Sequence, residues 1–108
     1  MLFRVGRLPD EALAAAAQFH AEALPRVLEA LGGADGHLVL AFPPADHAHR
    51  AWRLAVVQSL AREQVPLRVN GVEGDSAAAL AAACEWLSRA PGVTGQYWPL
   101  DASAPEGA

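Results

Sequence analysis

Ionisable side chains crowd one short stretch of the chain, AFPPADHAHRAW at residues 41–52. Asp46, His47, His49 and Arg50 follow there directly after an apolar run. An aspartate beside histidines has the groups needed for acid–base chemistry, and the carboxyl end of a parallel strand is where α/β proteins bind ligands. Asp46 also suits the N-cap of a helix, which would leave the histidines and Arg50 in solvent. We favour the capped helix start, and a ligand site stays open as the alternative.

A metal site is disfavoured by spacing. His47 and His49 are two positions apart, so on a helix they point about 200° away from each other. Zinc takes three or four ligands, and His20, His37 and Cys84 fall on other predicted elements. We therefore expect no metal and no cofactor.

The composition describes a folded protein of modest size. The chain has 108 residues, of which 53% are hydrophobic and 19% charged, which is enough for one small core. We predict a single domain over residues 1–100, followed by a disordered tail, DASAPEGA, at residues 101–108. The net charge is −4 and no basic stripe with interleaved aromatic residues is present, so nucleic acid is not expected as a partner.

Cysteine usage and the N-terminal sequence bear on the compartment. Cys84 is the single cysteine, so the chain cannot form an internal disulfide and suits a reducing compartment. The first residues, MLFRVGRLPDE, lack the apolar run of a signal peptide or membrane anchor. We expect a cytoplasmic protein that engages no membrane, with Cys84 as a small core residue of its helix.

Strand and helix signals alternate along the chain. Prolines, glycines and capping residues mark where elements begin and end, and apolar residues set the period. The predicted strands are residues 2–5, 37–42, 67–72 and 96–100, and the predicted helices are residues 10–31, 46–63 and 74–89. This order, β-α-β-α-β-α-β, predicts an α/β fold of Rossmann-like type with parallel strands, right-handed crossovers and two or three layers.

Periodicity predicts which helix faces are buried. The apolar stripe of the first helix consists of Leu13, Ala17, His20, Leu24, Val27, Leu28 and Leu31. Pro25 lacks a backbone N–H, so it should bend this helix near Ala21. Arg53 and Arg68 are expected to face solvent as ordinary charged residues.

The helix at residues 46–63 has a broad apolar arc. Trp52, Ala55, Val56 and Leu60 fall on one side, and other apolar residues widen the arc. A helix so broadly apolar is expected to pack against something besides its own sheet. The predicted oligomer contacts are Leu54, Val57 and Ala61 on this helix, and Trp86, Tyr97 and Trp98 near the C-terminus.

Three segments in register resemble the C-terminal half of the short-chain dehydrogenase/reductase (SDR) family. ALPRVLEALGGADGHLVLAF is similar to the family's long helix with Leu-Pro and the Gly-x-Ile-Val strand after it. AVVQSLAREQVPLRVNGVEG is similar to the helix ending in Ser-Leu-Ala-x-Glu and the Arg-Val-Asn-x-Val strand. AAACEWLSRAPGVTGQYWPLD is similar to the closing helix, the Val-Thr-Gly-Gln turn and the last strand. Order and spacing agree over residues 20–101, whereas residues 1–12 have no counterpart, so the chain resembles a truncated, degenerate member.

The resemblance implies catalytic groups that this sequence lacks. The family has a glycine-rich phosphate turn in the N-terminal half, a serine after the Ile-Val strand, a Tyr-x-x-x-Lys on the next helix and an asparagine on the preceding one. In register, Pro43 lies near the serine position, Asp46 at the tyrosine and Arg50 at the lysine, and the chain contains no lysine. The family's tyrosine donates a proton because lysine lowers its pKa, and an ionised aspartate beside arginine has no proton to give. The resemblance therefore implies a pseudoenzyme without catalytic residues.

Two functions remain open. The first is assembly without catalysis, as a homodimer or as a hetero-oligomer with an intact dehydrogenase. The resemblance implies a dimer contact of four helices, built from residues 10–31 and 46–63, and a second contact from the closing helix and strand. The alternative is a protein that binds a small molecule or nucleotide, or an enzyme of changed chemistry. Its site residues would be Asp46, His47, His49, Arg50 and Asn70.

Overall fold

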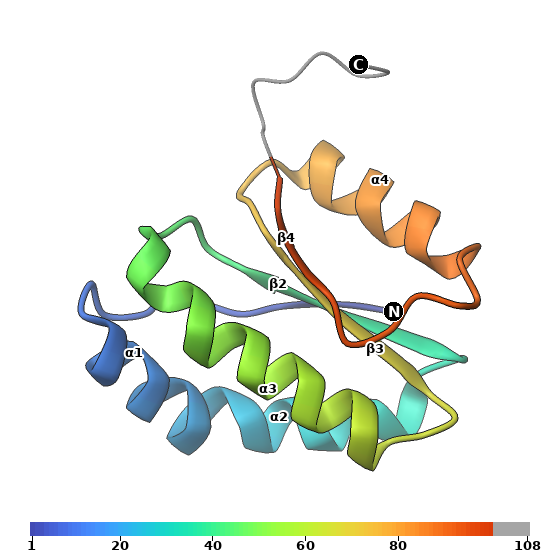
Figure 1. Cartoon of the computed structure of the whole chain (residues 1–108), viewed down its shortest axis with the longest axis horizontal. Coiled ribbons are helices and arrows are strands. Elements are labelled where there is room, and N and C mark those ends of the chain that lie inside the picture. Colours follow the sequence, from blue (N-terminus) through green and yellow to red (C-terminus); the bar gives the residue numbers. More distant parts are fainter. Residues whose placement is uncertain (101–108) are drawn as a thin grey trace.

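The computed structural model describes residues 1–100, and the predicted disorder of residues 101–108 lies outside that range. One four-stranded sheet carries helices on both faces (Figure 1). The strands are β1 (Leu2–Arg4), β2 (His37–Phe42), β3 (Arg68–Glu73) and β4 (Tyr97–Pro99). The helices are α1 (Ala12–Gln18), α2 (Leu24–Ala30), α3 (Arg50–Glu63) and α4 (Ala77–Ser88), with shorter turns η1 (Phe19–Ala23), η2 (Leu31–Gly33) and η3 (His47–His49).

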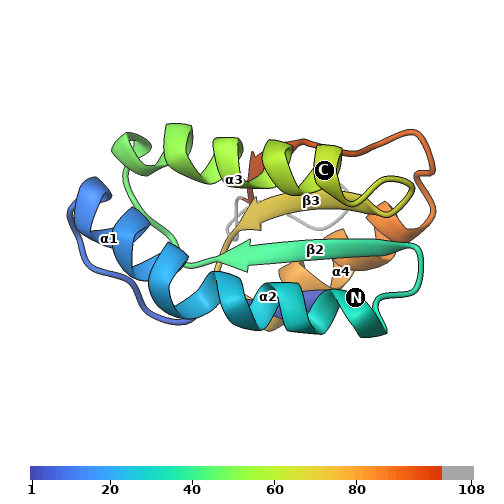
Figure 2. The same ribbon diagram turned by 90° about the horizontal axis from the view of Figure 1, so that it is seen from below.

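The strands are parallel and lie side by side in chain order, β1-β2-β3-β4. Helices α1, α2 and α3 cover one face of the sheet and α4 covers the other, as Figure 2 shows from below. The predicted α/β fold of Rossmann-like type is confirmed. It has three layers.

Strand β2 is buried along its whole length, because strands flank it on both edges and helices cover both faces. Leu38, Leu40 and Phe42 belong to the core beneath α1, α2 and α3. Val39 and Ala41 belong to the smaller core beneath α4. A strand with two covered faces needs a continuous apolar run, and HLVLAF supplies it.

A widened turn separates α1 from α2. Pro25 has no N–H to donate to the preceding turn, and the chain forms the π-helical turn η1 around Ala21. The regular α-helix is thus interrupted where Pro25 is expected to bend it.

The buried side of α1 and α2 differs from the predicted stripe. Ala15, Phe19, Ala23 and Val27 are buried at four-residue intervals, whereas Leu13 is 88% exposed. In a regular α-helix, the side chains of Ala15 and Val27 would point about 120° away from each other. The wider turn η1 absorbs that rotation, so periodicity that assumes an unbroken helix selects the wrong face in α1, whereas Val27 of the predicted stripe is buried.

Helix α3 lies close to the sheet because β3 has a glycine beneath it. The Asp46 side chain accepts a hydrogen bond from the Ala48 backbone N at 3.0 Å and caps η3, which leads into α3. Farther along, Val57 packs over Gly71, where an added Cβ would lie only 2.8 Å from Val57 Cγ2. The absence of a side chain at Gly71 therefore sets the distance between α3 and the sheet.

The last strand connection has the opposite hand from the first two. The β1–β2 and β2–β3 connections cross the same face, whereas α4 crosses the other face while the strand order continues in the same direction. The prediction of right-handed crossovers throughout is therefore wrong, because one of the three connections has the opposite hand from the other two. The apolar face at Val39, Ala41 and Val72 requires a cover, and Leu80 and Leu87 of α4 provide it.

Candidate functional site

The carboxyl ends of β2 and β3 lie side by side, and we refer to the point between them as the crevice. From β2 the chain leaves toward α3 on one face, and from β3 it leaves toward α4 on the other. Ligands of open α/β proteins bind where neighbouring strands send their connections to opposite faces. The stretch at residues 43–46 lies at this point, as the sequence predicts, and so does Glu73 at the end of β3.

The side chain of Glu73 accepts three hydrogen bonds at this point. Its Oε1 accepts a hydrogen bond from the Tyr97 hydroxyl at 2.7 Å and one from Arg53 Nη1 at 3.3 Å. Its Oε2 accepts the backbone N–H of Ala45 at 3.3 Å. The Tyr97 hydroxyl, Arg53 Nη1 and the Ala45 N–H are thus taken by a carboxylate of the chain itself.

Arg53 is the buried cation of this cluster. Its side chain is 1% exposed, with the guanidinium carbon 4.9 Å from the Phe42 ring centroid and 5.6 Å from that of Trp52. A charge is tolerated in such surroundings only when it is paired, and Glu73 supplies the partner. The expectation that Arg53 faces solvent is wrong, because Arg53 shares the buried side of α3 with Val56.

Tyr97 connects the two charges. Its hydroxyl donates to Glu73 and accepts a hydrogen bond from Arg53 Nη1 at 3.2 Å. Burial raises the pKa of Tyr97 to about 12, while the hydrogen bond from Arg53 works in the opposite direction. The hydroxyl therefore keeps its proton at neutral pH and serves as a hydrogen-bond bridge.

The four ionisable residues of the opening stretch do not converge on one point. His49 is buried, donates from Nε2 to the Asp10 carbonyl at 2.8 Å and accepts at Nδ1 from the Trp52 indole at 3.3 Å. Asp46 is exposed and caps η3, and His47 is exposed. Both nitrogens of His49 are therefore engaged, and no acid–base pair with Asp46 is formed.

Arg50 and Asn70 also have structural surroundings. The Arg50 guanidinium is exposed and stacks over the Tyr97 ring, 5.6 Å from its centroid. Asn70 is fully buried on the opposite side of the sheet, where it donates to the Val93 carbonyl and accepts from the Gln96 backbone N, both at 3.0 Å. The structure does not bring Asn70 to the crevice, since its amide holds the segment that leads into β4.

Arg68 departs from its expected position in solvent. It is half-buried, and its Nη1 donates to the carbonyls of Leu87 and Ala90 at 2.8 and 2.7 Å. Leu87 lies in the last turn of α4 and Ala90 follows the helix, and both carbonyls also accept a backbone N–H. Arg68 therefore caps α4 from the neighbouring strand.

A polar cavity of about 370 Å³ adjoins the crevice on the β1 side. It is lined by residues 7–10 after β1 and residues 43–46 after β2, with His49 and Arg53 beneath them. We refer to it as the Arg53 cavity.

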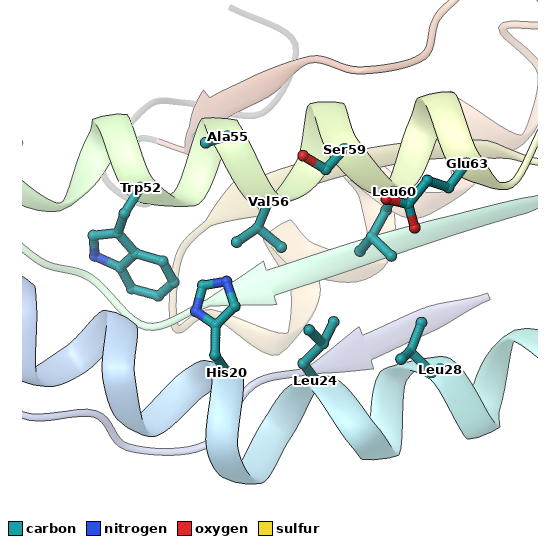
Figure 3. Close-up of a pocket in the computed structure, with 9 residues that line it drawn as sticks. All are labelled: His20, Leu24, Leu28, Trp52, Ala55, Val56, Ser59, Leu60 and Glu63. Atoms are coloured by element: carbon teal, nitrogen blue, oxygen red, sulfur yellow. The ribbon is translucent and has the colours of Figure 1, made fainter.

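An apolar groove of about 280 Å³ runs between α2 and α3 (Figure 3). His20, Leu24 and Leu28 line it from one side, and Trp52, Ala55 and Ser59 line it from the other. Leu28 is 47% exposed although it is fully apolar. Leu24 and Leu28 of the predicted first-helix stripe thus line this groove, whereas Val27 is buried in the core.

The residues predicted for oligomer contacts divide into two groups. Val57, Ala61 and Tyr97 are buried in the core, and Leu54 is half-buried against that core. Trp86 is 57% exposed, and half-buried Trp98 lines an apolar pocket with it. The side of α3 that borders the groove is formed instead by Trp52, Ala55 and Ser59.

Metal-binding and membrane-spanning features are absent from residues 1–100. In that range no group of three or more His, Cys, Asp and Glu side chains could hold a metal ion. None of the helices there is long and apolar enough to cross a bilayer. Cys84 is half-buried against the α4 core, near its expected position.

The fold and the crevice define a three-layer, Rossmann-like α/β protein. The family model described as short chain dehydrogenase-like protein matches residues 3–100. The chain therefore belongs to this SDR-like family, as the sequence resemblance predicts. The match also includes residues 3–12, for which the resemblance indicates no counterpart. No curated protein and no solved structure matches the chain.

Glu73 is not predicted from the sequence, and Arg53 is predicted in the wrong place. A signal for Arg53 is present, because it precedes Val56 and Val57 by three and four positions and so shares their side of the helix. Glu73 follows an apolar strand directly, at the edge where ligands bind in parallel sheets. Only the pairing of the two residues requires the tertiary structure.

Proposed function

We propose that this protein is a non-catalytic member of its family that acts through assembly, as a homodimer or as a subunit that joins an intact dehydrogenase. Its site of action in this proposal is the cytoplasm. The groove between α2 and α3 carries the proposal, because it exposes apolar side chains of two helices side by side (Figure 3). Exposed apolar surface of this kind marks interaction sites in soluble proteins.

The chemistry of the crevice supports the absence of catalysis. The position that corresponds to the family's proton-donating tyrosine holds Asp46, which caps η3. The position that corresponds to its lysine holds Arg50, which stacks on Tyr97. Glu73 occupies the Ala45 N–H, Arg53 Nη1 and the Tyr97 hydroxyl, so these three donors are not available to a substrate.

The shape of the groove favours a helical partner. Helices α2 and α3 have the groove between them, and the small side chains of Ala55 and Ser59 allow another helix to approach closely. The SDR resemblance implies that the equivalent helices of two copies pair across a twofold axis. A second copy of this chain would bury the groove in the same way.

The test compares one charge-introducing variant with a matched control by light scattering after size exclusion. The wild-type protein is expected to be a dimer. Ala55→Arg, at an exposed position that lines the groove, is expected to give a folded monomer, because burying the new charge in the contact is unfavourable. Ala14→Arg, the same substitution at an exposed position of α1 outside the groove, should leave the dimer intact.

Two results would contradict the proposal. A wild-type monomer at all concentrations that also fails to bind an intact family dehydrogenase would remove the assembly function. Equal dimerisation of Ala55→Arg and wild type would place the contact elsewhere, with the surface around Trp86 and Trp98 as the next candidate.

The alternative is a small-molecule or nucleotide-binding protein, with a site around Asp46, His47, His49 and Arg50. The Arg53 cavity favours it, since Asp46 and His49 line that cavity. His47 and Arg50 do not line it.

A further inference from the structure

Arg53 uses only part of its hydrogen-bonding capacity. Its Nη1 donates to the carbonyl of Pro43 at 2.9 Å, to Glu73 and to Tyr97. Its Nε is buried without a partner, and its Nη2 forms no hydrogen bond with any residue in the range 1–100. Buried polar groups without a partner are rare in folded proteins, and a bound ion or molecule can supply the missing acceptor.

The unused nitrogens belong to one edge of the guanidinium. The Nε–Nη2 edge carries parallel N–H groups with the spacing of the two oxygens of a carboxylate. Arg53 lies beneath the Arg53 cavity, whose volume of about 370 Å³ suits a small molecule. Among the residues that line the cavity, His49 offers no free nitrogen, since both are engaged.

The charges around the cavity disfavour a doubly charged anion. Arg7 lies exposed at the rim and adds a second cation. Asp10 and Asp46 also line the cavity, and Glu73 already balances Arg53. A phosphate with nearly two negative charges would be repelled by three carboxylates, whereas a monocarboxylate meets two arginines at less cost.

We propose that the Arg53 cavity binds a small monocarboxylate. Its carboxylate lies toward the free edge of Arg53, and its short apolar body lies between Leu8 and the neighbouring prolines, Pro9 and Pro44. This site is separate from the groove between α2 and α3. Failure of either proposal therefore does not contradict the other.

Nuclear magnetic resonance titration of the full chain with butyrate tests the site. Butyrate should shift the Arg53 Nε–H resonance and the amides of residues 7–10 and 43–46, while sodium chloride of equal ionic strength should not. Butyramide, which has the same shape without the charge, should bind about tenfold more weakly or worse, because hydrogen bonds between charged partners are stronger. Inorganic phosphate should also bind more weakly than butyrate.

Variants locate the binding residues. Arg53→Met should abolish the butyrate shifts, but it also leaves Glu73 without a cation and destabilises the fold, so Arg7→Ala provides the second test. Arg7→Ala, at an exposed position, should weaken butyrate binding severalfold, and the exposed control Arg62→Ala should not. Equal binding of butyrate and butyramide, tighter binding of phosphate, an unchanged Arg7→Ala variant or the absence of any butyrate shift would each overturn the proposal.

Discussion

Arg53 and Glu73 illustrate how a single buried charge decides the chemistry of its surroundings. Burial of an ion pair costs desolvation that its own attraction only partly offsets, so the pair needs further hydrogen bonds. Here the Pro43 carbonyl, the Tyr97 hydroxyl and the Ala45 N–H supply them. Arg53 Nη1, Glu73 and Tyr97 are therefore bound to one another, which is the residue-scale reason for proposing a protein without catalysis.

The titration of Tyr97 makes the stability of the folded protein depend on pH, and this effect can be measured without interference from other side chains. Its pKa is raised to about 12 in the folded protein and is about 10 in an unfolded chain, so the folded state holds the proton more tightly. Stability is therefore fully present below about pH 10 and is lost as the pH rises toward about 12. The chain has no lysine, and arginine stays protonated, so no other type of side chain titrates in this window.

Chemical denaturation at increasing pH checks this prediction. The midpoint should fall between about pH 10 and pH 12 in the wild type, and Tyr97→Phe should flatten that fall. Tyrosinate absorbance offers a direct control, because Tyr97 is the single tyrosine. A wild-type slope that Tyr97→Phe leaves unchanged would show that another group titrates.

Elements in this fold are placed by small residues as much as by large ones. Helix α3 lies against β3 at Gly71, and the Tyr97 ring approaches the same glycine, with its Cδ1 3.1 Å from an added Cβ. The π-helical turn η1 similarly lets Ala15 and Ala23 face the sheet together with Phe19. Short side chains at these points bring the helices close enough to form the groove between them.

Gly71→Ala tests this contact. An added methyl group 2.8 Å from Val57 Cγ2 must push α3 or Tyr97 away, and we expect a loss of about 1–3 kcal/mol of stability. Gly32→Ala is the matched control, because an added Cβ there meets nothing within 4 Å. Urea denaturation of both variants measures the difference, and equal stability would mean that α3 is free to shift.

The whole molecule has more apolar helix surface than its single sheet covers. Two helical units share one face of the sheet, and the groove between them stays open to solvent (Figure 3). A globular chain of this size buries a modest fraction of its surface, so association is an effective way to add to its stability. The proposed assembly therefore follows from the arrangement of layers rather than from any one residue.

Assembly makes thermal stability depend on protein concentration. If unfolding separates the two copies, the melting temperature of the wild type should rise as the protein concentration increases. Ala55→Arg should abolish that rise and Ala14→Arg should preserve it. Calorimetry over a wide concentration range measures both, and a wild-type melting temperature independent of concentration would oppose dimerisation.

Local signals in the chain suffice for the order of elements and the cap at Asp46, because capping, strand composition and the effect of Pro25 act within a few residues. Family membership is also predicted from the sequence, because the three segments that resemble the SDR family occur in the same order and spacing. Tertiary packing is needed to select the buried face of α1 and α2 and the hand of the last connection. It also directs Arg53 into the core, because the partners of Arg53 are distant in the chain: Glu73 lies 20 positions away and Tyr97 lies 44 away. Local periodicity contains no information about such pairs, and packing around them turns an expected surface charge into a buried one.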